Sequence, residues 1–339
     1  MIRKLPHKIK KVIKKLLRTI HYSYTGYQVY NFIQKLSGYK KEKQLILEMI
    51  GYYPNLKHPQ SLNEKILWKK IYDRNPLLPI ISDKYRVRDY LKEILGEKES
   101  EKILVPLLYV TDEPETIIFD NLPGEYIIKP NHASGWFILA ENIEKQKRYT
   151  IINENKTVIL SDCKQTRDEI INVCKEWLSR PYGFSSLEWA YQKIKRKIVI
   201  EKLLRDSNGN TPTTYEFFVF HGKCHLIYVF YNQFKDTSGA RYTPEWEYLN
   251  VRGILRMADY EKKPQNLQSI IDIAELLGKP FDFIRADLYL VDSKIYFGEL
   301  TNYSMSGTNR FDPVSFDFEL GSKWKVVHKY WKNINPDNH

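Results

Sequence analysis

Three charged residues, Arg285, Asp287 and Glu299, lie in a stretch whose other residues suit a buried β-hairpin. Apolar and charged residues alternate over 283–291, and side chains two residues apart share one face of a strand. A connection of odd length centred on 292–294 would set Glu299 opposite Asp287, whereas a two-residue turn would send Glu299 to the other face. Two acids and an arginine facing one another are costly unless a further cation lies between them. A divalent cation is the natural candidate, because Mg²⁺ takes one or two carboxylates together with water and phosphate oxygens.

Two more predicted strands end in charged residues. In residues 125–130, Lys129 precedes a proline and a loop of small and polar residues, where a lysine and backbone N–H groups can reach phosphate oxygens. In residues 195–204, Glu201 is followed by three residues whose backbone groups could meet an adenine edge. Each signal alone is weak, because most strand-end lysines are merely solvated and most strand-end acids only mark a boundary.

Composition indicates a folded protein with an anionic partner. The 339 residues are 42% hydrophobic, and the net charge is +12, which favours a nucleotide, an acidic glycan, a membrane surface or a nucleic acid. No recognisable base-reading motif is present, so nucleic acid is not expected. The sequence also lacks the GxxxxGK[ST], GxGxxG, HExxH and GxSxG motifs and the DxD pair of many glycosyltransferases.

Periodicity predicts helices, then strands, then a helix and further strands, so the expected class is α+β or mixed α/β. Ser61 followed by Glu64 fits a capping box that opens a helix. The other elements expected are helices over 82–96, 167–180 and 267–277 and a hairpin over 214–232. No apolar run approaches the roughly 20 residues of a membrane-spanning helix. Three cysteines without metal-type spacing favour a reduced, cytoplasmic compartment.

The pattern of the first 20 residues predicts a basic amphipathic helix. Apolar residues recur at helical spacing while lysine and arginine fill the opposite side, as in helices that lie on an anionic membrane surface. The alternative is a helix packed on the body of the protein with solvated lysines. The apolar positions are Ile9, Val12, Ile13, Leu16, Leu17 and Ile20.

The order of these signals resembles the ATP-grasp superfamily and, more closely, the TupA-like ATP-grasp family. That family is named for teichuronopeptide biosynthesis and is found in loci for capsule and cell-surface polysaccharides. The matching segments are SLNEKILWKKIYDRNPLLPIISDKYRVRDYL, IIKPNHASGW, IVIEKLL, TYEFFVFHGK, FDFIRADLY and FGELTNYSMSG. The resemblance implies two α+β subdomains that clamp ATP. The implied organisation is a basic helix (1–20), a helical region (21–80) and an ATP-grasp domain (81–335) with a nucleotide lid at about 118–202 and a catalytic part at about 203–335.

The resemblance also implies site residues. Asp287 and Glu299 would bind Mg²⁺, and Arg285 would stabilise charge on the transferred phosphoryl group. The residues expected to bind ATP are Arg88, Lys129, Asn131, His132, Ser134, Gly135, Glu201, Lys202, Leu203, Leu204 and Glu216, with Thr214 as an alternative to Glu216. Those expected on the acceptor side are Asn302, Ser306 and Gly307. The sequence departs from the family at Thr301, where many relatives carry asparagine, so either Asn302 takes that role or a second metal site is weaker.

The function implied by the resemblance is an ATP-dependent ligase. It would activate a carboxylate as an acyl phosphate and join it to an amine, with ATP and Mg²⁺ as cofactors. The expected partners are an amino acid and an acidic glycan, or its sugar-nucleotide or lipid-linked precursor, for work at the inner face of the cytoplasmic membrane. The alternative is a transferase of the same pathway, either a glycosyltransferase or an enzyme that phosphorylates a glycan.

Overall fold

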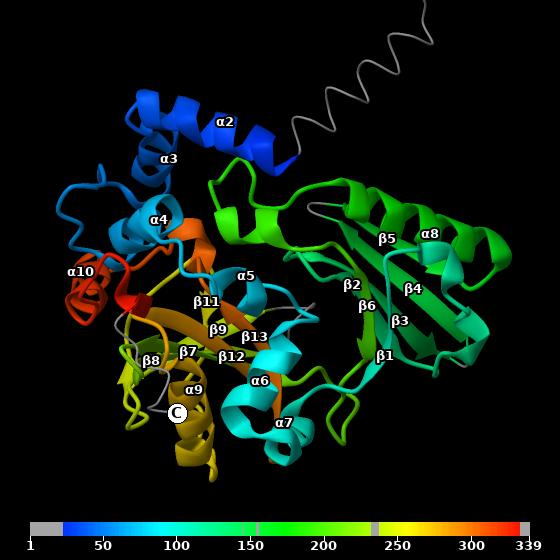
Figure 1. The fold of residues 1–339 in the computed structure, drawn as a ribbon. Helices are drawn as coiled ribbons and strands as arrows, with labels where there is room; N and C mark the ends of the chain where they lie inside the picture. Colours follow the sequence, from blue (N-terminus) through cyan, green and yellow to red (C-terminus); the bar gives the residue numbers. More distant parts are fainter. Residues whose placement is uncertain (1–22, 145, 154–155, 232–236, 333–339) are drawn as a thin grey trace, which may run out of the picture.

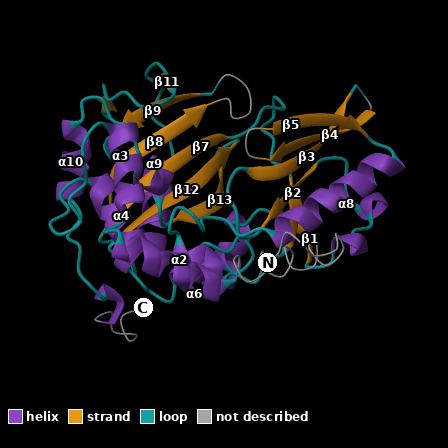
Figure 2. Ribbon diagram, turned by 90° about the horizontal axis from the view of Figure 1, so that it is seen from above, coloured by secondary structure: helices purple, strands orange, loops and turns teal. Residues whose placement is uncertain are grey.

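The computed structural model describes residues 23–144, 146–153, 156–231 and 237–332. Two antiparallel sheets lie side by side, and helices pack around them (Figures 1 and 2). The chain is thus mixed α and β, as predicted. The predicted basic helix over residues 1–20 lies outside the described residues.

The first sheet has six strands in the order β1-β6-β2-β3-β4-β5, each antiparallel to its neighbours. Its apolar face packs on helix α8 (Lys164–Ser179), where Ile170 and Trp177 meet Tyr126 and Ile128. The strands are β1 (Leu107–Thr111), β2 (Tyr126–Pro130), β3 (Trp136–Ile143), β4 (Gln146–Asn153), β5 (Lys156–Ser161) and β6 (Ile198–Lys202).

The second sheet has the order β10-β9-β8-β7-β12-β13, with β11 beside β9. Helix α9 (Leu267–Gly278) covers one face and packs on β7, β8 and β12. The strands are β7 (Thr213–Phe220), β8 (Lys223–Tyr231), β9 (Ser238–Tyr242), β10 (Tyr248–Leu249), β11 (Arg256–Met257), β12 (Phe283–Val291) and β13 (Lys294–Thr301).

Each sheet turns its apolar face to its own helix and leaves its charged face toward the other sheet. In β12 the residues Ile284, Ala286 and Leu288 enter the core, so Arg285 and Asp287 point to the opposite side. In β2 the alternation buries Ile128 against α8 and leaves Lys129 on the other face.

The predicted pairing of the β12–β13 hairpin is confirmed, but the predicted connection is wrong. Asp287 pairs with Glu299, although the turn has only two residues, Asp292 and Ser293, both with positive φ. A β-bulge restores the register, because Leu288 pairs with Phe297 and the residue between, Gly298, is left over. A Cβ at Gly298 would lie 2.9 Å from the carbonyl oxygen of Asp287, so the bulge requires glycine.

The remaining helices come mostly from the N-terminal third. The capping box is confirmed, because the Ser61 hydroxyl accepts the Glu64 N–H and the Glu64 carboxylate accepts the Ser61 N–H. The helix predicted from residue 82 begins only at Val87, since Asp83 caps the preceding turn at the N–H groups of Tyr85 and Arg86. The α-helices are α2 (Tyr24–Leu36), α3 (Lys40–Ile50), α4 (Leu62–Tyr72), α5 (Leu78–Ile81), α6 (Val87–Leu95), α7 (Glu97–Ile103) and α10 (Ser315–Ser322). The 3-10 turns are η2 (Pro114–Thr116), η3 (Phe119–Asn121), η4 (Trp189–Lys193), η5 (Ser304–Gly307) and η6 (Tyr330–Lys332).

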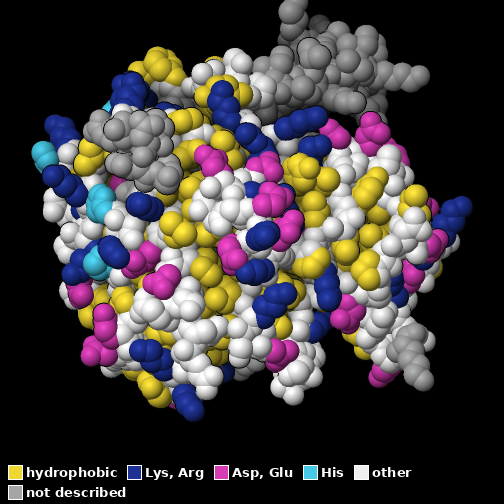
Figure 3. Space-filling model, turned by 60° about the horizontal axis from the view of Figure 1, so that its bottom comes forward, with side chains coloured by type: hydrophobic (Ala, Val, Ile, Leu, Met, Phe, Trp, Pro, Cys, Tyr) yellow, Lys and Arg dark blue, Asp and Glu magenta, His cyan; other side chains and the backbone are white. Residues whose placement is uncertain are grey.

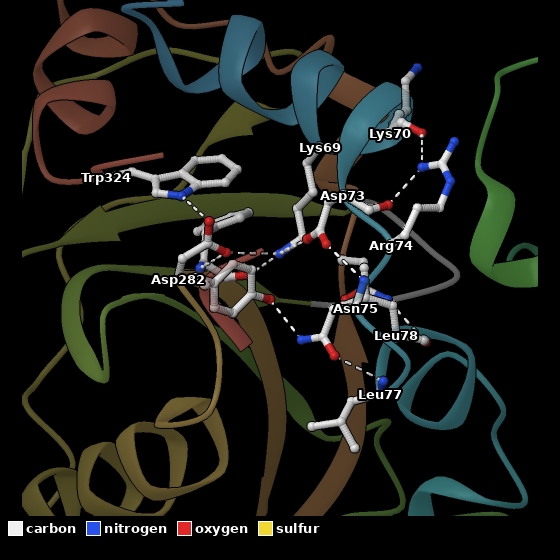
Figure 4. A network of polar contacts seen from close by, with 12 residues as sticks. Lys69, Lys70, Asp73, Arg74, Asn75, Leu77, Leu78, Asp282 and Trp324 are labelled. Atoms are coloured by element: carbon white, nitrogen blue, oxygen red, sulfur yellow. Dashed lines mark hydrogen bonds and ion pairs between the residues drawn. The ribbon is translucent and has the colours of Figure 1, made fainter. Parts of the chain in front are cut away.

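Helix α4 ties the N-terminal helices to the start of β12 (Figure 4). The fully buried Lys69 donates to the Phe283 carbonyl at 2.7 Å and lies 3.3 Å from the Asp282 carboxylate. Asp282 also accepts the indole N–H of Trp324 at 2.8 Å, and Asp73 lies 3.8 Å from Lys69. A buried lysine needs such partners, so this network fixes the strand that carries Arg285.

Charge on the surface is mixed in sign. On the face drawn in Figure 3, acidic and basic side chains lie side by side in the middle of the molecule, bordered by apolar ones. Among the residues described, no helix is long and apolar enough to cross a membrane.

Candidate active site

Arg285 lies among three carboxylates on three adjacent strands. Its Nη2 atom is 2.6 Å from Asp287 Oδ2, 3.1 Å from Glu216 Oε1 and 3.6 Å from Glu299 Oε1. The register explains this meeting, because Asp287 on β12 pairs with Glu216 on β7 and with Glu299 on β13. One guanidinium cannot neutralise three carboxylates, so the cluster favours a further cation.

The pKa values of Glu216 and Asp287 reflect mainly their burial and, to a lesser degree, the neighbouring acids. Burial raises the pKa of Glu216 to about 7, although Arg285 opposes the shift. Burial likewise raises the pKa of Asp287 well above its ordinary value, against the effect of Arg285 and with that of Glu216. A bound cation would favour the ionised form of both groups.

Glu299 differs from the other two acids because a lysine lies beside it. Burial alone would raise its pKa, but Lys84, Arg285 and the Thr301 hydroxyl together lower it. Lys84 Nζ lies 3.7 Å from Glu299 Oε2 and donates to the Ala133 carbonyl at 2.7 Å. Burial also lowers the pKa of Lys84. Lys84 thus joins the loop after β2 to the acids of the second sheet.

Sequence reasoning missed Lys84 and named Arg88, four residues later. Arg88 contacts the first sheet and the loop before it: its Nη1 donates to the Val105 carbonyl at 3.0 Å and lies 3.4 Å from Glu201 Oε1. Glu201 Oε2 also pairs with Lys129 Nζ at 2.6 Å. The charges of Lys129 and Glu201 both act on the pKa of Lys84. Lys84 and Lys129 are therefore close enough between the sheets for their charges to interact.

A narrow pocket adjoins Lys129. Its volume is about 70 Å³, and Tyr289 of the second sheet contributes to its wall. The residues of the first sheet and its following loop in this wall are Val105, Ile127, Lys129, Glu201, Lys202, Leu203, Leu204, Thr211 and Pro212. All four residues predicted to meet adenine thus line one largely apolar slot between the sheets.

The loop after β2 holds its first two polar side chains inside the protein. Asn131 donates to Asp83 at 2.8 Å and accepts the Lys197 N–H at 2.8 Å. The His132 ring lies 3.0 Å from the Arg180 carbonyl, and burial lowers its pKa to about 3, so the ring is neutral. These two side chains fix the base of the loop. Ser134 bonds to the Tyr182 hydroxyl, and Gly135 adopts a φ of 74°.

The residues after β13 bond to the N-terminal helices. The Asn302 amide donates to the Ser82 hydroxyl at 2.7 Å and is fully buried, so it points away from the acids. Thr301 occupies the position nearest the acids, because its hydroxyl donates to Glu299 at 2.9 Å and accepts from Arg285 at 3.2 Å. Ser306 accepts a hydrogen bond from Lys70 at 3.0 Å.

Gly307 packs directly on α4. A Cβ there would lie 3.1 Å from the Asn63 carbonyl oxygen, and its φ of 81° favours glycine. The segment 302–307 is therefore held by α4 and by the segment around α5, which come before both sheets in the sequence.

A chain of hydrogen bonds reaches Arg285 from α4. Arg285 Nη1 donates to the Ser304 hydroxyl at 3.3 Å, and that hydroxyl donates to Asn309 Oδ1 at 3.1 Å. Asn63 accepts from the Asn309 backbone N–H at 2.8 Å, and its own amide donates to Asp317 at 2.7 Å. The buried Asn63 therefore holds the loop that orients Arg285.

A family model for TupA-like ATP-grasp proteins matches residues 64–325. The chain belongs to the TupA-like ATP-grasp family. No curated protein matches it.

Solved structures with the ATP-grasp fold resemble this TupA-like chain. A D-alanine–D-alanine ligase from Bacillus anthracis is 16% identical with a TM-score of 0.37, and the match covers 66% of this chain and 57% of that one. An L-amino acid ligase from Bacillus licheniformis is 15% identical with a TM-score of 0.35, over 67% and 42% of the two chains. A RiPP-associated ATP-grasp ligase from Chryseobacterium gregarium is 9% identical with a TM-score of 0.34, over 78% and 69%. The matched part of this chain thus covers less than two thirds of the length of the D-alanine–D-alanine ligase.

The acids of this TupA-like chain could bind a divalent cation only if a bound ligand supplied further oxygen donors. The described residues hold no preformed group of three or more acidic, histidine or cysteine side chains able to coordinate a metal ion. Asp287 and Glu299 supply the hard oxygen donors that Mg²⁺ prefers, and Mg²⁺ commonly takes the rest of its shell from water and nucleotide phosphates. The donor set therefore fits Mg²⁺ bound together with a nucleotide.

A second pocket, of about 190 Å³, opens on the other side of Arg285. Arg241 lies deep in its wall: its guanidinium is 4.1 Å from the Tyr228 ring centroid, and its Nε has no hydrogen-bond partner among the described residues. Arg310 lines this pocket and also a neighbouring polar one of about 610 Å³. The sequence analysis did not name Arg241 or Arg310, because both lie outside the segments that resemble the family. The remaining lining residues are Glu216, Phe218, Phe230, Ile254, Leu255, Met305, Asn309 and Phe311.

Proposed function

We propose that this protein is an ATP-dependent carboxylate–amine ligase that joins an amino acid to a uronic acid of a cell-surface polysaccharide or its precursor. Membership of the TupA-like family and the fold support an ATP-grasp ligase. The single observation that carries the proposal is Arg285, which lies among the three acids and lines the 190 Å³ pocket. The substrates rest on the setting in which the family is found.

The two sheets would hold the nucleotide between them. The slot beside Lys129 would take the adenine ring, because its wall is largely apolar and the backbone of 202–204 offers polar groups at its edge. Lys129 and Lys84 would contact phosphate oxygens. In the free protein Lys129 pairs with Glu201 at 2.6 Å, so the phosphates would share the lysine with this carboxylate.

Asp287 and Glu299 would hold Mg²⁺, which supplies positive charge to the ATP phosphates when it is bound. The chain's own contribution is alignment and charge. Arg285 would bind the phosphoryl group in transfer, and a guanidinium suits this task because its planar fork matches phosphate oxygens. Thr301 and Ser304 keep that guanidinium in place.

The acceptor carboxylate would enter from the 190 Å³ pocket. Its oxygen would attack the γ-phosphorus of ATP, ADP would leave, and an acyl phosphate would form. The amine nitrogen would then attack the acyl carbon, so that phosphate leaves and a proton is lost from nitrogen. Arg310 and Arg241 supply positive charge on the side where an anionic acceptor would lie, and aromatic rings line the same pocket.

Hydroxylamine trapping tests this proposal. The protein would be incubated with ATP, Mg²⁺, a uronic-acid oligosaccharide and hydroxylamine, and the products would be measured by mass spectrometry. We expect an oligosaccharide hydroxamate, ADP and phosphate in equal amounts, and their loss in Asp287→Asn. A stable phosphorylated glycan without released phosphate would instead identify a glycan kinase. In a parallel incubation with a nucleotide-sugar in place of ATP, consumption of the nucleotide-sugar would identify a glycosyltransferase; either result would overturn the proposal.

A further inference from the structure

Helix α2 is apolar on two opposite sides. One side packs on the protein, where Tyr27 is buried, donates to the Leu187 carbonyl at 3.1 Å and meets the Phe184 ring at 5.8 Å. The other side carries large apolar side chains at positions i, i+3, i+4 and i+7, which share one face of a helix. These are Val29, Phe32, Ile33 and Leu36, which are 56%, 59%, 54% and 73% exposed. A helix whose outer face is this apolar lacks an evident partner within the described protein.

Helix α3 extends the same kind of surface. Leu45 and Met49 lie one turn apart on α3, and each is 43% exposed. The two helices are joined by the turn at residues 37–39. Figure 1 shows both helices at the edge of the molecule. We call the exposed apolar residues of α2 and α3 the hairpin face.

Exposed lysines lie on the same two helices as the hairpin face. Lys35, Lys40 and Lys41 are exposed, whereas α2 contains no acidic residue. Of the two acids on α3, Glu42 is buried against Lys70 at 3.0 Å, which leaves Glu48 exposed. The sequence that precedes α2 repeats this combination of apolar and basic residues over 1–20. The exposed apolar residues and lysines of α2 and α3 therefore complement a partner that has an apolar layer bordered by negative charge.

We propose that the hairpin face docks on an anionic lipid bilayer. A helix lying in the interface buries an apolar stripe below the headgroups and places lysines among them, and α2 and α3 carry both kinds of side chain. Each lysine near an anionic leaflet adds attraction that salt weakens. This docking rests on surface residues alone and is independent of the proposed ligase activity.

Vesicle co-sedimentation tests the proposal with the full chain. Vesicles of phosphatidylcholine mixed equally with phosphatidylglycerol would be compared with vesicles of phosphatidylcholine alone. We expect binding to the anionic vesicles, weakened by salt, and about tenfold weaker partitioning of the double variant Phe32→Ser/Ile33→Ser, which removes two interfacial side chains. The matched control is Ile118→Ser/Ile159→Ser, since these residues are 62% and 65% exposed and lie in the loop before β2 and on strand β5, respectively. Its partitioning should equal that of the wild type.

A fluorescent probe gives a local readout. In a Cys163→Ser background, a polarity-sensitive dye on Ile33→Cys should shift to the blue with anionic vesicles, whereas the dye on Ile159→Cys should not. Equal partitioning of the α2 variant and the wild type, or an unshifted dye at residue 33, would overturn the proposal. A concentration-dependent dimer that the α2 variant loses, without vesicle binding by the wild type, would assign the hairpin face to a second copy and would also overturn it.

Discussion

Replacing Glu216 by glutamine is expected to change how the stability of the nucleotide-free protein depends on pH. Burial raises the pKa of Glu216 from 4.5 to about 7. Between these two values the native protein keeps a proton that the unfolded chain releases, so rising pH favours the unfolded chain. Stability is therefore lost from about pH 4.5 to about pH 7, and the glutamine variant has no such proton to lose.

The size of the effect follows from the same values. A difference from 4.5 to about 7 corresponds to about 3 kcal/mol, at about 1.4 kcal/mol per pH unit. This is an upper limit, because Asp287 shares Arg285 with Glu216 and part of the charge cost remains in the variant. At pH 8 we expect Glu216→Gln to be more stable than the wild type, and at pH 4.5 we expect similar stabilities.

Urea unfolding measured by circular dichroism across pH 4.5–8, without nucleotide or Mg²⁺, provides the assay. Glu319→Gln is the matched control, since Glu319 is an exposed carboxylate on α10. Its curve should parallel that of the wild type. If the curves of Glu216→Gln and the wild type were parallel over the whole range, the reasoning about the buried acids would be refuted.

Three further changes test other parts of the site. Lys84→Gln should weaken ATP binding in calorimetry by about tenfold or more, because a buried charged hydrogen bond is lost, and unchanged affinity would remove Lys84 from the phosphate site. Gly298→Ala should lower the free energy of unfolding by about 1–3 kcal/mol, since its Cβ would lie 2.9 Å from the Asp287 carbonyl oxygen, and a fully stable variant would argue against the bulge. Arg310→Gln should raise the KM for the anionic acceptor several-fold while leaving ATP affinity unchanged, and an equal effect on both would place Arg310 outside the acceptor side.

The sequence was sufficient to place the acids but not to explain their pairing. Alternation in β12 put Arg285 and Asp287 on one face, and the structure agrees. The turn could not be derived, because a two-residue turn with a bulge at Gly298 gives the same pairing as a three-residue connection without one. Such a choice depends on how the backbone bends locally, which alternation does not encode.

Residues whose roles depend on packing between distant segments were the hardest to predict. Lys84 gains its role only because the turn before α6 lies against β13, more than two hundred residues along the chain. The polar loop after β2 looked like a phosphate cradle, yet Asn131 is fully buried and bonded to Asp83. Small polar residues near a strand end serve either purpose, and only the tertiary neighbours distinguish them.

The buried lysines of α4 also bear on the order in which the chain can fold during synthesis. Lys69 is fully buried and finds its partners at Asp282 and Phe283, and Lys65 finds carbonyl acceptors at Gly321 and Trp324. A ribosome releases α4 long before these partners exist, so until then the lysines must stay in water. The six-stranded sheet, by contrast, draws all its strands from residues 107–202 and can form while the rest is still being made. We therefore expect the nascent chain to carry a finished first sheet and an undocked α4 until residues 321–324 emerge.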